Sequence, residues 1–355
     1  MLIMSFNLGW SPSTMAVKMG IKRCGTSKVG GGCGVCKVSA TDSDISCGDG
    51  GCSNGGQFPT FLPREVEKIK DPFARSLAQR ITRIPVKVKI GFSETSVMSS
   101  CVKPSVRRQT KSPVVLLHCF DSSCLEWRCT YPSLEEAGLE AWAVDILGWG
   151  FCDLELRPPC DVASKRYHLY QLWKSYINRP MTLVGPSLGA SAAIDFAANF
   201  PEAVEKLVLI NPSVYTKGTG NLAKLPVPVA YAGVSLLRSL PLRLYATLLA
   251  FNDVSFSTIL DWTRVGRLHC LQPWWTDATV NFMLSGGYDV NASIKQVKQK
   301  TLIIYGEHDQ IVNCKVAEAL QSQLSNAIIQ QVPNSGHLPH VDNAKYVAQL
   351  IVDFT

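Results

Sequence analysis

The stretch "LVGPSLGASAA", Leu183 to Ala193, predicts a strand, a sharp turn and a helix in immediate succession. Residues 180–186 are almost wholly apolar, as in a strand that is covered on both faces. Small residues follow Ser187, which suits a closely packed helix. The centre of the stretch has the form G-x-S-x-G, in which Gly185 and Gly189 leave room for a very sharp turn. The stretch therefore predicts a serine held at the end of a strand, beside the free N–H groups and the positive dipole end of a helix.

Short apolar runs alternate with amphipathic stretches from about residue 84 to residue 355. Such alternation is typical of right-handed crossovers between parallel strands. We therefore predict an α/β fold with a mainly parallel eight-stranded sheet and helices on both faces. The expected strands are 84–92, 96–102, 113–120, 139–147, 180–186, 206–212, 301–307 and 327–333, and the clearest helices are 161–176, 188–200, 314–325 and 344–354.

Residues 213–292 interrupt this alternation. They have helical character, they are rich in leucine and aromatic residues, and they contain no convincing parallel strand. An insertion of this length between two strands is too long for a simple loop. We predict a helical cap between the sixth and seventh strands, with the core of the fold divided between residues 78–212 and 293–355.

The first 60 residues have the composition of a targeting segment. They are rich in Ser and Gly, and Asp and Glu are absent before Asp42. The first 20 residues lack the unbroken apolar run of a secretory signal, so the segment predicts an organelle transit peptide followed by a Gly/Ser-rich linker, both disordered. An unstructured tail without an address is the alternative, and these residues alone do not distinguish a plastid from a mitochondrion. A polar helical lead-in is expected at 64–81.

The charge and cysteine content exclude several classes of protein. The net charge is +7, but five of the basic residues lie before Asp42, and the rest of the chain has 30 basic and 28 acidic residues. There is no footprint for nucleic acid. Five of the 13 cysteines lie in the first 52 residues, including the "CGVC" pair, yet no second tight pair would close a zinc site, so we predict no metal and no cofactor. No run of about 18 apolar residues predicts a membrane span.

A serine nucleophile requires a base and an acid, and two loops supply candidates in the expected chain order. Asp309 follows the apolar run 301–305, and His337 follows the run 327–333. With Ser187, these residues would all lie at carboxyl ends of parallel strands, where open α/β sheets form their sites.

Neighbouring titratable residues compete for these roles. Glu307 lies in the turn itself, where we expect it to be solvated, and His340 falls at the start of the last helix, where a capping or surface position is ordinary. His168 and His269 lie in helical patterns without a loop context. We therefore predict Asp309 and His337 as the partners of Ser187.

With "GPSLG", "DILGWG" (Asp145, Gly148 and Gly150) and "NSGH", residues 80–355 resemble the α/β-hydrolase superfamily, and specifically its capped serine hydrolases from plant plastids. The resemblance implies a hydrolase, most often of carboxylic esters, and a chloroplast address. It does not imply a substrate, because one fold hosts many chemistries.

The resemblance also locates an oxyanion hole. One donor would be the N–H of Leu188, and the other the N–H of Phe120, in the "HCF" loop that begins at His118. Family members have Gly where this chain has Cys119, so the loop either is ordinary in φ, or is strained, or aims the Phe120 N–H wrongly. Asp145 is expected to be a structural acceptor near this loop.

We therefore predict a carboxylic ester hydrolase with a Ser-His-Asp triad. The apolar cap suits an acyl, prenyl or phytyl ester, although the same residues could simply pack the cap onto the core. A carbon–carbon bond hydrolase with the same triad, or a ligand-binding member with an idle triad, remains as an alternative. A carboxylate nucleophile, as in epoxide hydrolases and dehalogenases, is disfavoured by Ser187. The stretch 236–251, with Arg238 and Arg243, could also lie on a membrane surface.

Overall fold

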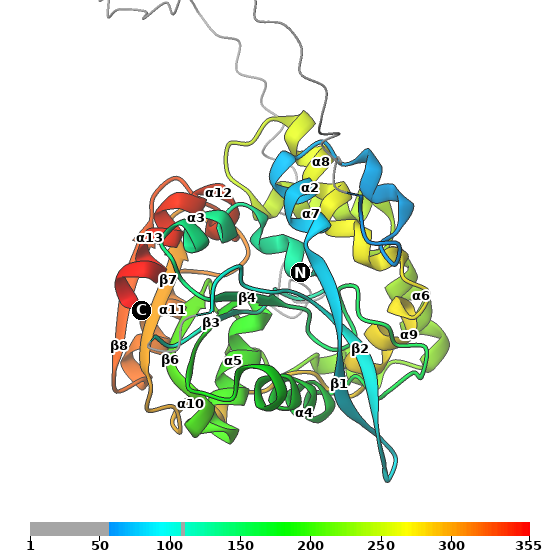
Figure 1. The fold of residues 1–355 in the computed structure, drawn as a ribbon, viewed down its shortest axis with the longest axis horizontal. Helices are drawn as coiled ribbons and strands as arrows, with labels where there is room; N and C mark the ends of the chain where they lie inside the picture. Colours follow the sequence, from blue (N-terminus) through cyan, green and yellow to red (C-terminus); the bar gives the residue numbers. More distant parts are fainter. Residues whose placement is uncertain (1–56, 108–110) are drawn as a thin grey trace, which may run out of the picture.

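A computed structural model describes residues 57–107 and 111–355, which form an eight-stranded sheet with helices on both faces (Figure 1). The strand order is β1-β2-β4-β3-β5-β6-β7-β8. The strands are β1 (Ile81–Ile90), β2 (Ser93–Val102), β3 (Val114–Leu116), β4 (Ala141–Val144), β5 (Met181–Pro186), β6 (Val204–Ile210), β7 (Lys300–Gly306) and β8 (Ala327–Val332).

The sheet is mainly parallel, as the alternating pattern predicts. Strands β3 to β8 pair in parallel, whereas β1 and β2 form an antiparallel hairpin that joins the sheet through an antiparallel contact with β4. Strands β3, β4 and β5 are buried at every residue, in keeping with their unbroken apolar runs. The prediction of the fold class is therefore confirmed.

Two helical layers enclose the sheet, each with its own apolar core (Figure 1). One layer contains α4, α5 and α11, and the other contains α3 and α13 with the segment that precedes β1. The helices are α2 (Pro72–Gln79), α3 (Tyr131–Glu136), α4 (Val162–Leu172), α5 (Leu188–Asn199), α6 (Val227–Leu237), α7 (Leu240–Ala250), α8 (Phe256–Arg267), α9 (Trp275–Leu284), α10 (Asn291–Ile294), α11 (Lys315–Gln323), α12 (Pro339–Asp342) and α13 (Ala344–Phe354).

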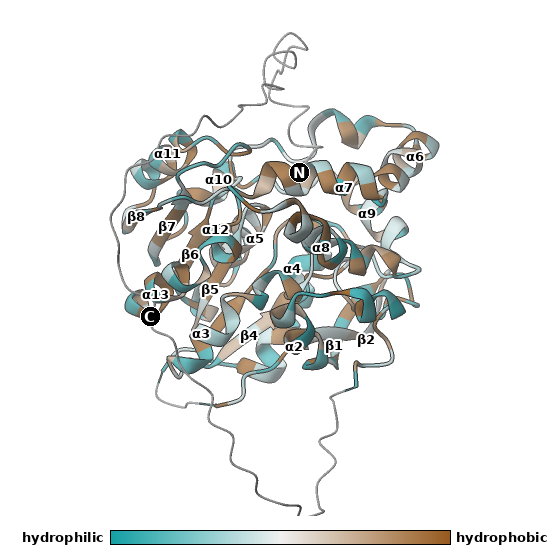
Figure 2. Ribbon diagram, turned by 90° about the horizontal axis from the view of Figure 1, so that it is seen from above, coloured by the Kyte–Doolittle hydropathy of each residue, from teal (hydrophilic) through white to brown (hydrophobic). Residues whose placement is uncertain are grey.

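Helices α6 to α10 fill the chain between β6 and β7, where the sequence predicts an insertion. Helices α6 and α7 lie at the outer edge of the molecule and are largely apolar (Figure 2). The limits of the cap at residues 213 and 292 remain a prediction.

The lead-in before β1 packs against the cap rather than forming one helix. A short 3₁₀ helix, η3 (Arg64–Lys68), ends before Asp71, whose side chain caps α2 by accepting the N–H groups of Phe73 and Ala74. The predicted continuous helix breaks at the Asp71–Pro72 step because proline disfavours helical geometry in the residue before it. The backbone N–H groups of Lys70 and Asp71 then donate to Asp261 of α8.

The predicted transit peptide and the "CGVC" cysteines lie outside the described residues. Within residues 57–107 and 111–355, no helix is both long and apolar enough to cross a membrane.

Candidate active site

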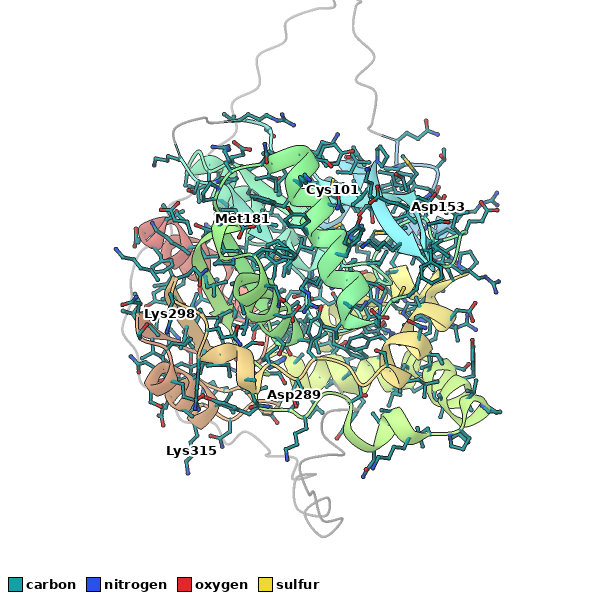
Figure 3. All side chains as sticks on the ribbon, turned by 90° about the horizontal axis from the view of Figure 1, so that it is seen from below. Cys101, Asp153, Met181, Asp289, Lys298 and Lys315 are labelled. Carbon is teal, nitrogen blue, oxygen red and sulfur yellow. The ribbon has the colours of Figure 1, made fainter. Side chains whose placement is uncertain are left out.

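Ser187 lies on a strained turn between β5 and α5. Strand β5 begins at the buried Met181, which is labelled in Figure 3, and ends at Pro186, directly before the serine. Ser187 has φ 51° and ψ −115°, a conformation that is costly for a residue with a Cβ. Its backbone is fixed by donation of its N–H to the carbonyl of Ile210 at 2.8 Å. The turn therefore holds the serine at the carboxyl end of the central strands.

The glycines on either side of Ser187 have separate steric reasons. A Cβ on Gly185 would collide with the carbonyl of Gly189. A Cβ on Gly189 would lie 2.6 Å from the carbonyl oxygen of His118, in the loop after β3. The start of α5 thus touches the loop that carries the predicted second oxyanion donor.

His337 and Asp309 form a buried pair at the same edge of the sheet. Asp309 follows β7 and His337 follows β8, and the Nδ1–H of His337 donates to Oδ2 of Asp309 at 2.8 Å. The other carboxylate oxygen of Asp309 accepts the N–H groups of Ile311 and Val312 at 2.7 and 3.0 Å, which fixes its orientation. The Nε2 of His337 is buried and has no partner among the described residues.

The structure brings Ser187, Asp309 and His337 to the carboxyl ends of β5, β7 and β8. No hydrogen bond joins Ser187 to His337 within the described residues. The serine–base contact is often long without substrate, and it tightens only when the substrate is bound.

The two backbone N–H groups predicted for the oxyanion hole have no acceptor among the described residues. Leu188 is the first residue of α5, so its N–H has no acceptor within the helix. The N–H of Phe120 donates to no backbone or side-chain acceptor among the described residues. Both groups are therefore free to donate to a ligand.

His118 ties the loop after β3 to the loop after β4. Its Nε2 accepts the N–H of Ile146 at 3.0 Å, so Nδ1 carries the proton and donates to the carbonyl of Cys119 at 2.7 Å. Burial of the ring lowers the pKa of His118. A neutral imidazole therefore supports the loop.

Cys119 takes an ordinary backbone conformation, which answers the question that this departure from glycine raises. It is absent from the residues with positive φ, and the left-handed residue of the loop is instead Asp121, with φ 52°. The side chain of Cys119 packs among Ala250, Leu338 and Val341. Burial raises the pKa of the thiol well above its ordinary value, which disfavours a thiolate nucleophile.

Asp145 accepts three hydrogen bonds that join the segment after β3 to β2 and to the loop after β4. Its donors are the N–H of Cys124 at 2.6 Å, the N–H of Phe151 at 2.9 Å and the hydroxyl of Ser100. A Cβ on Gly150 would overlap the carboxyl group of Asp145, which explains this glycine. The geometry fits a structural acceptor.

The competing residues have other partners. Glu307 is partly exposed and accepts the N–H of Asn334 at 2.9 Å. The expected surface or capping position of His340 is wrong, because its Nε2 contacts the buried carboxylate of Glu126 at 3.0 Å and its ring lies against Trp127. Burial would raise the pKa of Glu126, but the hydrogen bond and charge of His340 outweigh it and lower the pKa to about 2.

Sequence reasoning missed Asn211, which binds the loop that carries His337. Its amide group donates to the carbonyls of Gly336 and His337 at 3.1 and 2.8 Å, and its Oδ1 accepts the N–H of Gly306 at 2.9 Å. The sequence signal is an asparagine between an apolar run and Pro212, and the structure gives this residue a φ of 41°, which asparagine tolerates. Asn211 therefore links the loops after β6, β7 and β8.

A buried cluster between the loop and the cap was also missed. Asp121, Arg243, His269 and Trp275 meet there through hydrogen bonds. Arg243 therefore does not face a membrane, as the sequence had suggested for its stretch. Asp121, His269 and Cys270 have the spacing of metal ligands, but the guanidinium group of Arg243 already neutralises the carboxylate. We find no fit to a cation in this cluster.

A cavity of about 130 Å³ opens between the loop after β3 and helices α7 and α8. Its wall includes Phe120 of the loop, Trp262 of α8 and Leu338, and most of its lining is apolar. Ser187 and His337 are outside the wall. The cavity thus lies beside the predicted oxyanion loop and not directly over the serine.

Comparison with known sequences agrees with the fold. A model of the alpha/beta hydrolase family matches residues 114–350. The alpha/beta hydrolase domain-containing protein VTE7 of Arabidopsis thaliana is 62% identical over 302 residues, which cover 85% of this chain and 92% of that protein. A 2-hydroxy-6-oxononadienedioate/2-hydroxy-6-oxononatrienedioate hydrolase of Paraburkholderia phymatum is 25% identical over 260 residues, covering 69% of this chain and 87% of the relative.

The fold is also shared with solved structures. A thermophilic esterase from Thermogutta terrifontis superposes with a TM-score of 0.63 at 16% identity, covering 77% of this chain and 97% of the esterase.

Proposed function

Because this chain belongs to the alpha/beta hydrolase family, we propose that it is a serine hydrolase that cleaves carboxylic esters. The observation that carries the proposal is the buried Asp309–His337 pair, whose free Nε2 lies at the same sheet edge as the strained Ser187. A base oriented by a carboxylate is what a serine needs in order to become a nucleophile.

In the proposed reaction, His337 takes the proton of Ser187 as the hydroxyl oxygen attacks the ester carbonyl. The N–H groups of Phe120 and Leu188 donate to the oxyanion of the tetrahedral intermediate, each contributing about 3–4 kcal/mol of barrier reduction. His337 then protonates the leaving alcohol, and the same nitrogen activates water against the acyl-enzyme. Asp309 keeps the imidazole in the required tautomer throughout.

We propose that the substrate is an apolar ester with an acyl, prenyl or phytyl chain. The cavity beside Phe120 has a largely apolar wall built from α7, α8 and the residue after His337. A pocket of this kind favours hydrocarbon, with orientation supplied by a few polar groups. A panel of esters that differ in chain length tests this, and a preference for short polar esters would contradict it.

Labelling with a fluorophosphonate probe tests the catalytic serine. The wild-type protein should be labelled, and Ser187→Ala should not. Ser191→Ala is the matched control, because Ser191 lies one turn further along α5 and its hydroxyl donates to the carbonyl of Ser213. Failure of a folded wild-type protein to react would overturn the hydrolase proposal and leave a ligand-binding role.

Carbon–carbon bond hydrolysis is the second candidate, since one relative is named as a hydrolase of 2-hydroxy-6-oxononadienedioate and 2-hydroxy-6-oxononatrienedioate. The same three residues would serve that reaction. Turnover of a 2-hydroxy-6-oxo-dienoate without turnover of any ester would favour this candidate.

We propose a chloroplast location for the protein. The basic, acid-free leader has the composition of a transit peptide, and the close relative comes from a plant. Fusion of residues 1–60 to a fluorescent protein should direct it into isolated chloroplasts. Retention outside the organelle would contradict the proposal.

Peripheral contact with a membrane is proposed for the outer face of α6 and α7. Residues 213–252 contain no Asp or Glu. The exposed apolar side chains there include Val227, Val229, Leu236, Leu240 and Leu248, and the exposed basic residues of the same stretch include Lys217, Lys224 and Arg238. Apolar and basic residues together suit an anionic lipid surface. In a flotation experiment the protein should rise with anionic lipid vesicles, and Leu236→Glu should reduce the fraction that does so. A wild-type protein that does not float with the vesicles would contradict the proposal.

A further inference from the structure

Asp121 has an unusual position in the loop that is proposed to form the oxyanion hole. It directly follows Phe120, it is buried, and its φ of 52° is costly for a residue with a Cβ. Aspartate tolerates this conformation better than most residues, but the conformation still needs support from its surroundings. The support comes from the side chain.

Three parts of the cap donate to the carboxylate of Asp121. Arg243 of α7 donates from its guanidinium group to Oδ2, and Trp275 at the start of α9 donates from Nε1 to Oδ1 at 2.7 Å. His269, in the 3₁₀ helix η8 (Leu268–Leu271), contacts the same Oδ1 through Nε2 at 2.8 Å. The carboxylate thus joins three separate cap elements to one residue of the core.

The surroundings of Asp121 stabilise the ionised form of its carboxyl group. Burial alone would raise the pKa of Asp121, but the charge of Arg243 and the hydrogen bonds of His269 and Trp275 outweigh it and hold the pKa well below its ordinary value. Arg243 has a further anchor, because it donates to the carbonyl of Gly266 in α8 at 3.0 Å.

The cluster does not form a second nucleophilic site. Cys270 lies 3.3 Å from Nε2 of His269, but this is the same nitrogen that contacts Asp121, so the ring cannot relay between a thiol and a carboxylate. Burial also raises the pKa of Cys270 well above its ordinary value. A structural role remains for this cluster. It lies directly beside Phe120, whose N–H must point in the right direction to serve the oxyanion hole.

We propose that Asp121 is a positioning residue through which the cap sets the direction of the Phe120 N–H, so that the oxyanion hole is complete only when the cap is docked. This rests on the proposed hydrolase function. The Phe120 N–H lies in the rigid peptide plane between residues 119 and 120, and fixing Asp121 fixes the next peptide plane and so restrains the dihedral angles of Phe120 from which this N–H takes its direction. Loss of the cap donors would release Asp121 from its left-handed conformation and turn the donor away.

The first test is Asp121→Asn, which keeps the shape and one acceptor but removes the charge that holds Arg243. We expect kcat for an ester to fall by about 10-fold or more, as for the loss of an oxyanion donor, while KM stays within about twofold. Glu140→Gln is the matched control, because the buried carboxylate of Glu140 pairs with Arg179 just before β4, at the amino ends of the parallel strands. An equal loss of kcat in both variants would overturn the proposal.

The second test asks whether Asp121 and Arg243 act as one unit. Arg243→Gln should reproduce the loss, Arg243→Lys should restore most of the activity by keeping the charge, and the Asp121→Asn/Arg243→Gln double variant should lose no more than about twofold beyond either single variant. Independent, multiplying losses would contradict coupling through this pair.

Hydrogen exchange gives a readout that does not depend on turnover. In Asp121→Asn, peptides that cover residues 118–123 and α7 should exchange faster than in the wild type, and they should be unchanged in Glu140→Gln. If the wild type is not labelled by fluorophosphonate, the proposed function fails, and this exchange pattern alone decides whether the cap holds the loop. Unchanged exchange at both peptides would overturn the inference.

Discussion

Cys119 shows how a residue can stand where a glycine is expected without strain when the left-handed conformation lies elsewhere in the loop. The loop after β3 places its left-handed conformation at Asp121, so Cys119 needs no special φ. Its N–H donates to the carboxylate of Glu126 at 3.2 Å, and its side chain fills a small apolar cluster. The cysteine is therefore a packing residue beside the site.

Cys119→Gly should retain ester hydrolysis within about twofold and should lower stability. The variant deletes a buried side chain and adds freedom to the unfolded chain, which together cost roughly 1–2 kcal/mol of the free energy of unfolding. Steady-state kinetics and thermal denaturation check the two effects. A collapse of activity in a folded variant would mean that the thiol takes part in the reaction.

Asn211→Ala should reduce both activity and stability, because it leaves two carbonyls and one N–H without their partner in the loops around His337. Unpaired buried groups cost about 1–3 kcal/mol each. Asn211→Gly is the control, since it relieves the strain of φ 41° without restoring the hydrogen bonds. We expect hydrolysis by both variants to be similarly slow; full activity of the glycine variant would exclude a role for Asn211 in positioning His337.

The residues that sequence patterns identify are those in local motifs. Ser187 lies in a five-residue pattern, and Asp309 and His337 each follow an apolar run. Asp121 and Asn211 could not be found in this way, because each acquires its role from partners that are about 90 to 150 positions distant in the chain. Only the folded chain brings those partners together.

At the scale of elements, the start of α5 and the loop after β3 are held at contact distance by Gly189. Gly189→Ala should lower kcat/KM by about 100-fold or more, because the new Cβ forces the His118 carbonyl away and separates the two oxyanion donors. Gly233→Ala is the control, since nothing lies within 4 Å of a Cβ on this residue of α6, and alanine should stabilise the helix by up to about 1 kcal/mol. Steady-state kinetics of both variants test the loss of kcat/KM, and thermal denaturation tests the change in stability.

Unbroken apolar runs predict the buried strands at the right places in the chain, but β3 (Val114–Leu116) and β4 (Ala141–Val144) are shorter than the expected 113–120 and 139–147. The lead-in was predicted less well, because the pattern of 64–81 is helical on average while the Asp71–Pro72 step divides it. The cap was expected as a set of helices, but its contacts with Asp121 could not be deduced, since helix periodicity does not say which distant loop a helix packs against.

For the whole molecule, His168 should make stability sensitive to acid. Burial, with the nearby charge of Lys165, lowers the pKa of this α4 histidine to about 3, whereas it is about 6.5 in an unfolded chain. Between these values the unfolded chain binds a proton that the folded protein does not, so the free energy of unfolding falls as pH falls through this window. His168→Leu should flatten this dependence in urea unfolding at pH 7.5 and pH 5.

The exposed His308 provides the control for that experiment. His308→Gln should keep the pH dependence of the wild type, because nearly half of the His308 side chain is exposed. Parallel pH dependence in wild type and His168→Leu would show that His168 is not the source.

Truncation separates the leader from the lead-in. Removal of residues 1–56 should leave melting temperature and kcat unchanged. Removal of residues 1–80 should lower the melting temperature by several degrees or prevent folding, since it deletes the buried Asp71–Arg128 ion pair and the apolar residues around Leu77. Thermal denaturation and activity of the two shortened proteins check this. Equal stability of both would contradict a structural role for the lead-in.

The bond between the lead-in and α8 also has a consequence for the order of folding. Asp261 receives the N–H of Lys70 across 191 positions of the chain. Contacts between residues that are distant in the chain make folding slow, because the entropy of closing a long loop is lost before the contact can stabilise the structure. A chain that emerges amino end first, from a ribosome or a translocation pore, presents the lead-in early and its partner late. The apolar residues of the lead-in therefore stay exposed until α8 has been made. We expect a chaperone to bind the nascent protein at these residues.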